Sequence, residues 1–206
     1  MAYPILARDY LSRAKSALEE RGQQGLFYAA FELRCCIEAR QAEYVEALSA
    51  YKDTKIRPWK LSQEGRRIRS QSNASTIALV SYSFPDGTTY DSFHTPVTDA
   101  LIEFAERTLH SLMHCQTRFR DDDDPWWQRA RDEMNNGYRM AWLSCQGDSM
   151  VPPLWDPKTK QLHPSRFEIR EDNAHLLELL AGLKGQTVNV NVSYPDQPPS
   201  DWICDL

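Results

Sequence analysis

The strongest constraint in the sequence is a nearly uninterrupted apolar run at positions 26–37. It reads Leu-Phe-Tyr-Ala-Ala-Phe-Glu-Leu-Arg-Cys-Cys-Ile, so a helix built from it is apolar almost all round. A helix of that kind is normally buried at the centre of a domain. The apolar spacing continues beyond the run, and we expect one long helix over residues 26–51.

The residues before this run predict a second helix. Over residues 5–21, apolar side chains recur at helical spacing and charged side chains occupy the other positions. Gly22 and Gly25 then mark a short turn. A short turn between two helices favours an antiparallel helical hairpin at residues 5–51.

A β-hairpin is expected after a polar segment. Residues 54–75 are polar and irregular, which predicts a long loop with at most one short helical turn. Strand-like sequence flanks the turn signal Pro85-Asp86-Gly87, and we expect a hairpin over residues 76–93. A third helix is predicted from Thr95-Pro96 to about residue 117.

The remainder of the chain predicts shorter elements. Pro125 opens a fourth helix with Asp124 as its N-cap, and Asn136-Gly137 is expected to end it. Beyond it we expect, in order, a strand at 138–145, a loop at 146–164, a strand at 166–170, a helix at 173–183 capped by Asp172, a strand at 188–194 and an irregular tail.

These elements predict an α+β protein. We expect a helical N-terminal domain at residues 1–118 that carries the inserted hairpin 76–93, a connecting helix at 119–137, and a smaller antiparallel β-rich module at 138–206. The length of 206 residues is enough to bury a sizeable core.

Charge and composition exclude several classes of function. The net charge is −5, so a general electrostatic grip on nucleic acid is not expected. A basic cluster within residues 56–70 and an acidic run at Asp121–Asp124 are interpreted as solvated loops, although the basic cluster leaves a local RNA contact open. No signal peptide, membrane span or nucleotide-binding, protease or esterase motif is recognised, which favours a cytoplasmic protein.

Four polar residues in the third helix form the densest candidate site. They are Glu103, Arg107, His110 and His114, at spacings that place them on one helical face. One interpretation is an exposed face with an ordinary Glu103–Arg107 ion pair. A second is a metal site formed by the two histidines, and a third is cleavage of RNA.

The sequence argues against a bound metal or other cofactor. The residues between His110 and His114 include no Glu to serve as a general base, and Arg107 would repel a cation. The five cysteines are odd in number and show no CxxC spacing, which predicts free thiols. They are Cys35, Cys36, Cys115, Cys145 and Cys204.

The interpretation as a ribonuclease comes from a resemblance. The segment Arg107-Thr-Leu-His-Ser-Leu-Met-His114 and the apolar helix at 26–37 resemble the HEPN superfamily of helical nucleases, found in bacterial defence and toxin systems. The resemblance covers residues 5–118. It implies that Arg107 and His114 act without metal on the 2′-hydroxyl and phosphate of RNA, at a site built across a dimer. Thr108 stands where the family usually has Asn or Asp.

Arg34 and Glu38 are a second point of interest because they lie four residues apart in the apolar helix. We expect them to be largely buried and paired, as a structural ion pair that orients the helical hairpin. The alternative is that Arg34 lines a polar pocket shared with the third helix.

Taken together, these features favour a non-enzymatic interaction or regulatory module with a HEPN-like core. The expected partner is another protein or a second copy of the chain. The alternative is a metal-independent endoribonuclease that uses Arg107 and His114. Thr108 and the negative net charge favour the module.

Overall fold

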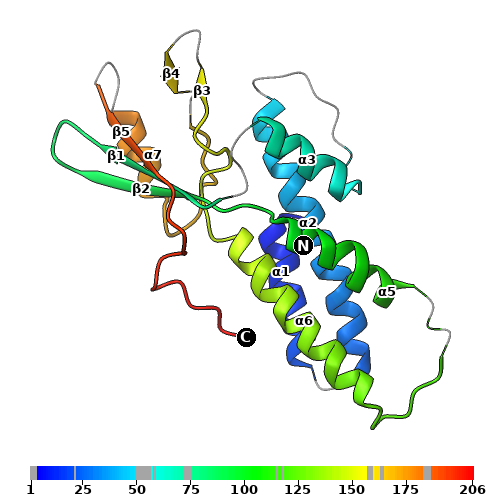
Figure 1. Ribbon diagram of the computed structural model, residues 1–206. Coiled ribbons are helices and arrows are strands. Elements are labelled where there is room, and N and C mark those ends of the chain that lie inside the picture. Colours follow the sequence, from blue (N-terminus) through cyan, green and yellow to red (C-terminus); the bar gives the residue numbers. More distant parts are fainter. Residues whose placement is uncertain are drawn as a thin grey trace.

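The computed structural model is an α+β structure in which a helical bundle joins a three-stranded antiparallel sheet (Figure 1). The sheet and the helix α7 lie beyond one end of the bundle. The structure describes residues 4–20, 22–49, 57, 59–71, 76–114, 116, 118–156, 160–162, 165–182 and 187–206.

The predicted helical hairpin is confirmed. Helix α1 spans Ala7–Glu19 and helix α2 spans Gln23–Ser49, and the two pack closely along their length. One side of the apolar run lies in the core, where Leu26, Leu33 and Ile37 are almost fully buried, whereas Tyr28 and Phe31 of the same run are exposed. The expected central position is therefore correct for one side of the helix and wrong for the other.

Helix α3, at Leu61–Gln71, replaces most of the loop expected over residues 54–75. Leu61, Glu64 and Ile68 are buried, and their spacing forms one stripe of a helix. The side-chain amide of Gln41 on α2 donates to the carbonyl of Leu61 at 3.2 Å. The prediction of a loop was wrong because the stripe is short and most of the residues around it are polar, so the helical pattern is hard to recognise in the sequence.

The third helix begins where the sequence places it and contains an irregular turn. It comprises α4 at Asp99–Phe104, a π-helical turn η1 at Ala105–Leu109 and α5 at His110–Met113. Thr98 is the N-cap and accepts a hydrogen bond from the Leu101 amide at 3.2 Å. The helix ends at Met113, four residues before the expected end at 117.

Helix α6 spans Pro125–Ser144 and is capped by Asp124, which accepts from the Trp126 amide at 2.9 Å. The expected end at Asn136-Gly137 and the expected strand at 138–145 are both wrong. Gly137 is buried inside the helix, where the ring of Phe104 occupies the space that a Cβ would need. The glycine permits close packing of two helices and does not end one.

The predicted hairpin is confirmed as strands β1 (Ala78–Ser83) and β2 (Thr89–His94), joined by a turn around Gly87 with a φ of 87°. Strand β5 (Asn189–Ser193) pairs antiparallel with β1, so the sheet order is β2-β1-β5. A small two-stranded ribbon forms from β3 (Trp155–Asp156) and β4 (Gln161–Leu162).

The C-terminal third contains less strand than predicted. Residues 166–170 form no strand, and only Phe167 makes an isolated bridge, to Ser149. Helix α7 (His175–Gly182) begins two residues later than expected and packs on the sheet through Leu176. The predicted boundary at 137/138 falls inside α6, and the hairpin shares one sheet with β5. The division into domains stays a prediction.

Within the described parts of the chain, no helix is long and apolar enough to cross a bilayer.

The close approach at Gly137 generates a test. Replacing a helical Gly with Ala normally stabilises a helix by about 1 kcal/mol. We expect Gly137→Ala to do the opposite and destabilise the fold by about 1–3 kcal/mol, because the new methyl group overlaps the Phe104 ring. Urea denaturation measures the change. Gly182→Ala is the matched control, because among the described residues, apart from its chain neighbours and its own helix backbone, no atom lies within 4 Å of the position that its Cβ would take, and it should leave stability unchanged or slightly raised. Equal stability of Gly137→Ala and the wild type would contradict the packing.

Candidate functional site

The four polar residues predicted on the third helix are exposed and form two separate pairs. Arg107 and Glu103 make an ion pair at 3.2 Å, with side chains 78% and 67% exposed. The Nε2 atom of His114 lies 3.2 Å from Nδ1 of His110, so one ring donates and the other accepts. An exposed i,i+4 ion pair contributes only a few tenths of a kcal/mol.

The π turn at Ala105–Leu109 contains Arg107 and ends just before His110. A π turn inserts one residue into the helix and rotates the positions after it. The prediction of one shared face assumed uniform α-helical spacing across Arg107 and His110. In the structure, Arg107 pairs with Glu103 before it in the chain, and His114 pairs with His110.

No group of three or more His, Cys, Asp or Glu in the described part of the chain is arranged to hold a metal ion. Four of the five cysteines are free thiols in the structure, and Cys115 lies outside the described residues.

Arg34 and Glu38 are paired as predicted, at 2.6 Å, and only 16% and 26% of their side chains are exposed. The remaining nitrogens of Arg34 donate to the Ala105 carbonyl at 3.2 Å and to the Trp59 carbonyl at 3.3 Å. Ala105 belongs to the π turn. Arg34 therefore connects α2 to the irregular turn and to the segment before α3.

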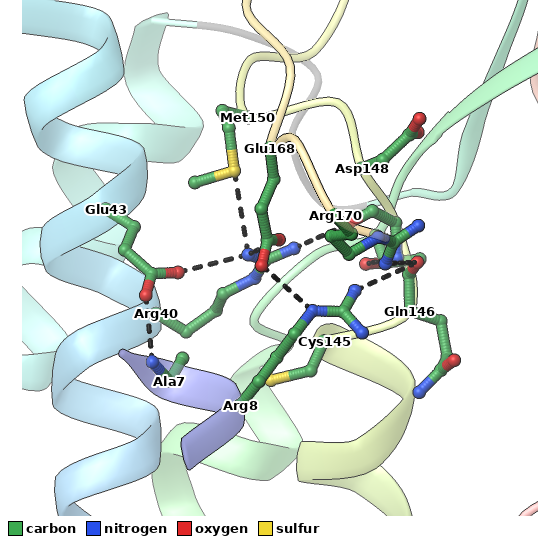
Figure 2. Close-up of polar contacts among 12 residues, drawn as sticks. Ala7, Arg8, Arg40, Glu43, Cys145, Gln146, Asp148, Met150, Glu168 and Arg170 are labelled. Carbon is green, nitrogen blue, oxygen red and sulfur yellow. Dashed lines mark hydrogen bonds and ion pairs between the residues drawn. The ribbon is translucent and has the colours of Figure 1, made fainter. Parts of the chain in front are cut away.

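The most tightly bonded polar cluster was not predicted, and it is centred on Arg40 of α2 (Figure 2). Its side chain is fully buried and bonds to Glu43 at 3.0 Å and to Glu168 at 3.1 Å. Burial lowers the pKa of Arg40, but the acidic groups around it, Glu43 and Glu168 among them, outweigh burial and raise it. The guanidinium is therefore charged at the centre of the protein.

Three arginines satisfy the backbone carbonyls at and just beyond the C-terminal end of α6. Such carbonyls lack intrahelical partners and carry partial negative charge. Arg40 donates to the carbonyls of Ser144 at 2.9 Å and Gly147 at 2.8 Å. Arg8 and Arg170 both donate to the Gln146 carbonyl, at 3.3 and 3.1 Å. The end of α6 is thereby fixed by residues from three distant segments.

The two carboxylates in the cluster extend it to the N-terminus of α1. Glu43 accepts from the backbone amide of Ala7 at 2.9 Å, and Glu168 accepts from Arg8 at 3.0 Å (Figure 2). An acidic group at a helix N-terminus is favourable. Glu168 also links the bundle to the C-terminal third, because it lies in the segment before α7.

The segment between α6 and β3 joins the Arg40 cluster to the sheet through Asp148. The buried carboxylate of Asp148 accepts from the hydroxyls of Tyr90 and Ser92 on β2 and from the Phe93 amide. His94, at the end of β2, is buried, and burial lowers its pKa to about 4. Its neutral ring donates from Nδ1 to the carbonyl of Ser149 at 3.1 Å.

The geometry assigns the Arg40 cluster a positioning role. All three guanidinium nitrogens of Arg40 donate to protein atoms, and the side chain is fully buried, so it does not face a ligand at the surface. A shallow groove of about 310 Å³ lies beside it, lined by Glu43, Met150 and Arg166 among others. Glu43 is itself held by Arg40 and Ala7.

One sequence signal could have revealed Arg40. It lies three residues after Ile37 and four before Tyr44, on the stripe of α2 that was predicted to be apolar. A charged residue on such a stripe requires buried partners. The partner Glu168 could not be foreseen, because it is 128 residues away in the sequence.

Removal of the buried cation should be costly. We expect Arg40→Met to destabilise the fold by about 3–5 kcal/mol, because two carboxylates and two carbonyls each lose one hydrogen bond to the buried guanidinium, and the two carboxylates lose their shared cation. Arg107→Met, at the exposed ion pair, is the control and should change stability by less than about 0.5 kcal/mol. Urea denaturation of both variants measures the difference. A loss for Arg40→Met no larger than that of the control would refute the role of the cluster.

Comparison with known proteins returned no match to a protein-family model, to a curated protein or to a solved structure. The HEPN resemblance therefore stays an expectation, and function has to be argued from the residues of the chain itself.

Proposed function

We propose that the protein is a non-enzymatic interaction module that pairs with a second copy of itself through the exposed face of α2. The observation that carries the proposal is the exposure of Tyr28 and Phe31, at 64% and 54%. Both lie on a helix whose other side forms the centre of the core.

The composition of this face supports a protein interface. Tyr28 and Phe31 are one helical turn apart, and Cys35 follows on the same side, half-buried. Trp59 is 63% exposed, and its carbonyl is bonded to Arg34 of α2. Aromatic residues and Arg are enriched at the centres of protein interfaces, and water-exposed aromatic surface costs free energy.

The charges beside the face suit a second copy. Arg34 and Glu38 border it and neutralise each other at 2.6 Å. Two antiparallel copies of α2 around a two-fold axis would bring Phe31 against Phe31 of the second copy without opposing like charges. A symmetric dimer is also the commonest form of oligomer.

The wider assignment follows the sequence resemblance. We propose that residues 1–118 form a HEPN-like core and that the protein acts in the cytoplasm as a component of a bacterial defence or toxin system. The support is the likeness of residues 26–37 and 107–114 to that superfamily.

The interface predicts a change in oligomeric state. Phe31→Glu should raise the dissociation constant of the dimer by roughly 30-fold or more, because a charge replaces a central aromatic contact. Sedimentation equilibrium over a range of concentrations measures it. Phe119→Glu is the control, since Phe119 is 87% exposed in the segment between α5 and α6, and it should leave the dimer intact. A wild type that is monomeric throughout, or a Phe31→Glu dimer of unchanged affinity, would refute the proposal.

A ribonuclease is the second candidate, and one contact favours it. Glu106 accepts hydrogen bonds from the amide and the hydroxyl of Ser62, at 3.1 and 2.6 Å. The helix that carries Arg107 and His114 thus lies against the N-terminus of α3. The exposed cations Arg57, Lys60 and Arg66 lie in or just before α3. A basic segment that contacts the helix carrying Arg107 suits a phosphate backbone.

Incubation with RNA distinguishes the two candidates. The interaction module predicts no cleavage by the wild type in the presence of EDTA. The ribonuclease predicts cleavage in EDTA that disappears in Arg107→Ala and in His114→Ala. His175→Ala, at an exposed histidine of α7, should retain it. Cleavage with that pattern would replace the proposed function.

A further inference from the structure

We propose that Cys36 and Cys145 are a modification site at which a peroxide forms a reversible disulfide. The pair joins α2 to the C-terminal end of α6. The inference is independent of the proposed pairing of two chains.

The geometry brings the two thiols into contact. Their sulfur atoms lie 3.9 Å apart, and both side chains are fully buried. Cys36 is on the buried side of α2, and Cys145 is the C-cap of α6. A disulfide requires a separation of about 2.05 Å, so a shift of about 2 Å between the two segments completes the bond.

The surroundings make one thiol the better nucleophile. The thiolate is the reactive form of cysteine, and nearby guanidinium groups stabilise it. The hydrogen bond from Cys36 lowers the pKa of Cys145 against the effect of burial, and Arg40 and Arg8 lower it further. The same hydrogen bond and burial raise the pKa of Cys36. Cys145 also follows Ser144, whose carbonyl accepts from Arg40 at 2.9 Å, so we assign Cys145 as the attacking thiol and Cys36 as the resolving one.

The reaction balances with hydrogen peroxide as the oxidant. The Cys145 thiolate attacks one peroxide oxygen, the O–O bond breaks, and the departing hydroxide takes a proton to become water. The resulting sulfenic acid is attacked by the sulfur of Cys36, an S–S bond forms, and the S–O bond breaks. The hydroxide released takes the proton of Cys36. Two thiols and one peroxide thus give one disulfide and two waters.

Two other described cysteines provide internal controls. Cys35 is adjacent to Cys36 in the chain but is half-buried, because successive side chains of an α-helix point about 100° apart around its axis. Burial raises the pKa of Cys35 to about 11, with Glu38 and Glu32 adding to the effect. Cys204 is half-buried near the C-terminus. Each is more accessible than Cys36 or Cys145, and among the described residues the thiol contact at 3.9 Å joins Cys36 to Cys145.

The disulfide would hold α2 and the C-terminal end of α6 at a fixed distance from each other. Cys145 lies between Ser144 and Gln146, whose carbonyls are held by Arg40 and Arg8. The loop that follows reaches the sheet through Asp148. Oxidation therefore ties α2 covalently to the segment that connects the bundle to the sheet, and closes a loop between residues 109 apart.

The test treats the full-length protein with hydrogen peroxide and maps its peptides without reduction. We expect one linked pair of peptides, containing Cys36 and Cys145, that separates on addition of dithiothreitol. The melting temperature of the oxidised protein should rise by roughly 5–10 °C, because the cross-link restricts the unfolded chain. The variants Cys36→Ala and Cys145→Ala should lose the linked peptides and the rise. Cys35→Ala and Cys204→Ala should keep both.

Several results would overturn the proposal. Wild-type protein in which Cys35 or Cys204 is oxidised while Cys36 and Cys145 stay reduced would do so. A disulfide with any other cysteine, Cys115 included, would do so as well. Peptide mapping of the wild type decides the matter even if the buried variants fail to fold.

Discussion

The structure depends on one buried cation. Arg40 binds two carboxylates from different segments and two carbonyls at the end of α6. A buried ion pair often contributes little net stability, since desolvation offsets the attraction between the charges. Its effect is on geometry: every partner of Arg40 has to lie where a planar guanidinium can reach it. The cluster thereby fixes how α1, α2, α6 and the segment before α7 meet.

The contacts between the helical bundle and the sheet also explain how helices and strands fold together in one chain. The sheet has few apolar residues of its own in the large core, and its small cluster around Tyr90 and Leu176 is separate. Much of the contact between sheet and bundle is polar. Asp148 accepts hydrogen bonds from β2, and the adjacent Gly147 carbonyl accepts from Arg40, while the ring of Tyr44 on α2 packs against His94 at the end of β2. Gly147 fits there because a Cβ would overlap the backbone of Phe93. Packing fixes the bundle, and hydrogen bonds place the sheet on it.

The elements that the sequence predicted correctly are those determined by residues close together in the chain. The hairpin of α1 and α2, the strands around Gly87 and the cap at Asp124 each follow from nearby residues. The failures have long-range causes. Gly137 resembles a helix end, and only the Phe104 ring shows that it is a packing position. The pairing of β5 with β1 and the reach of Arg40 to Glu168 connect residues that local patterns cannot relate. Of the candidate site, the exposed pairs of the third helix could be located from spacing, whereas the π turn that contains Arg107 could not.

Helix α2 is the element through which the parts of the molecule affect one another. One side carries Arg40 and Cys36 in the core, and the other carries Tyr28 and Phe31 at the surface. A helix of 27 residues behaves as a stiff body, so a displacement at Cys36 is transmitted to Phe31 within about one and a half turns. Coupling of this kind requires an element with two arrangements that both sites favour differently. Arg40 restrains such a displacement, because it bonds the carbonyl of Ser144, the residue before Cys145, and the two sulfur atoms already lie 3.9 Å apart.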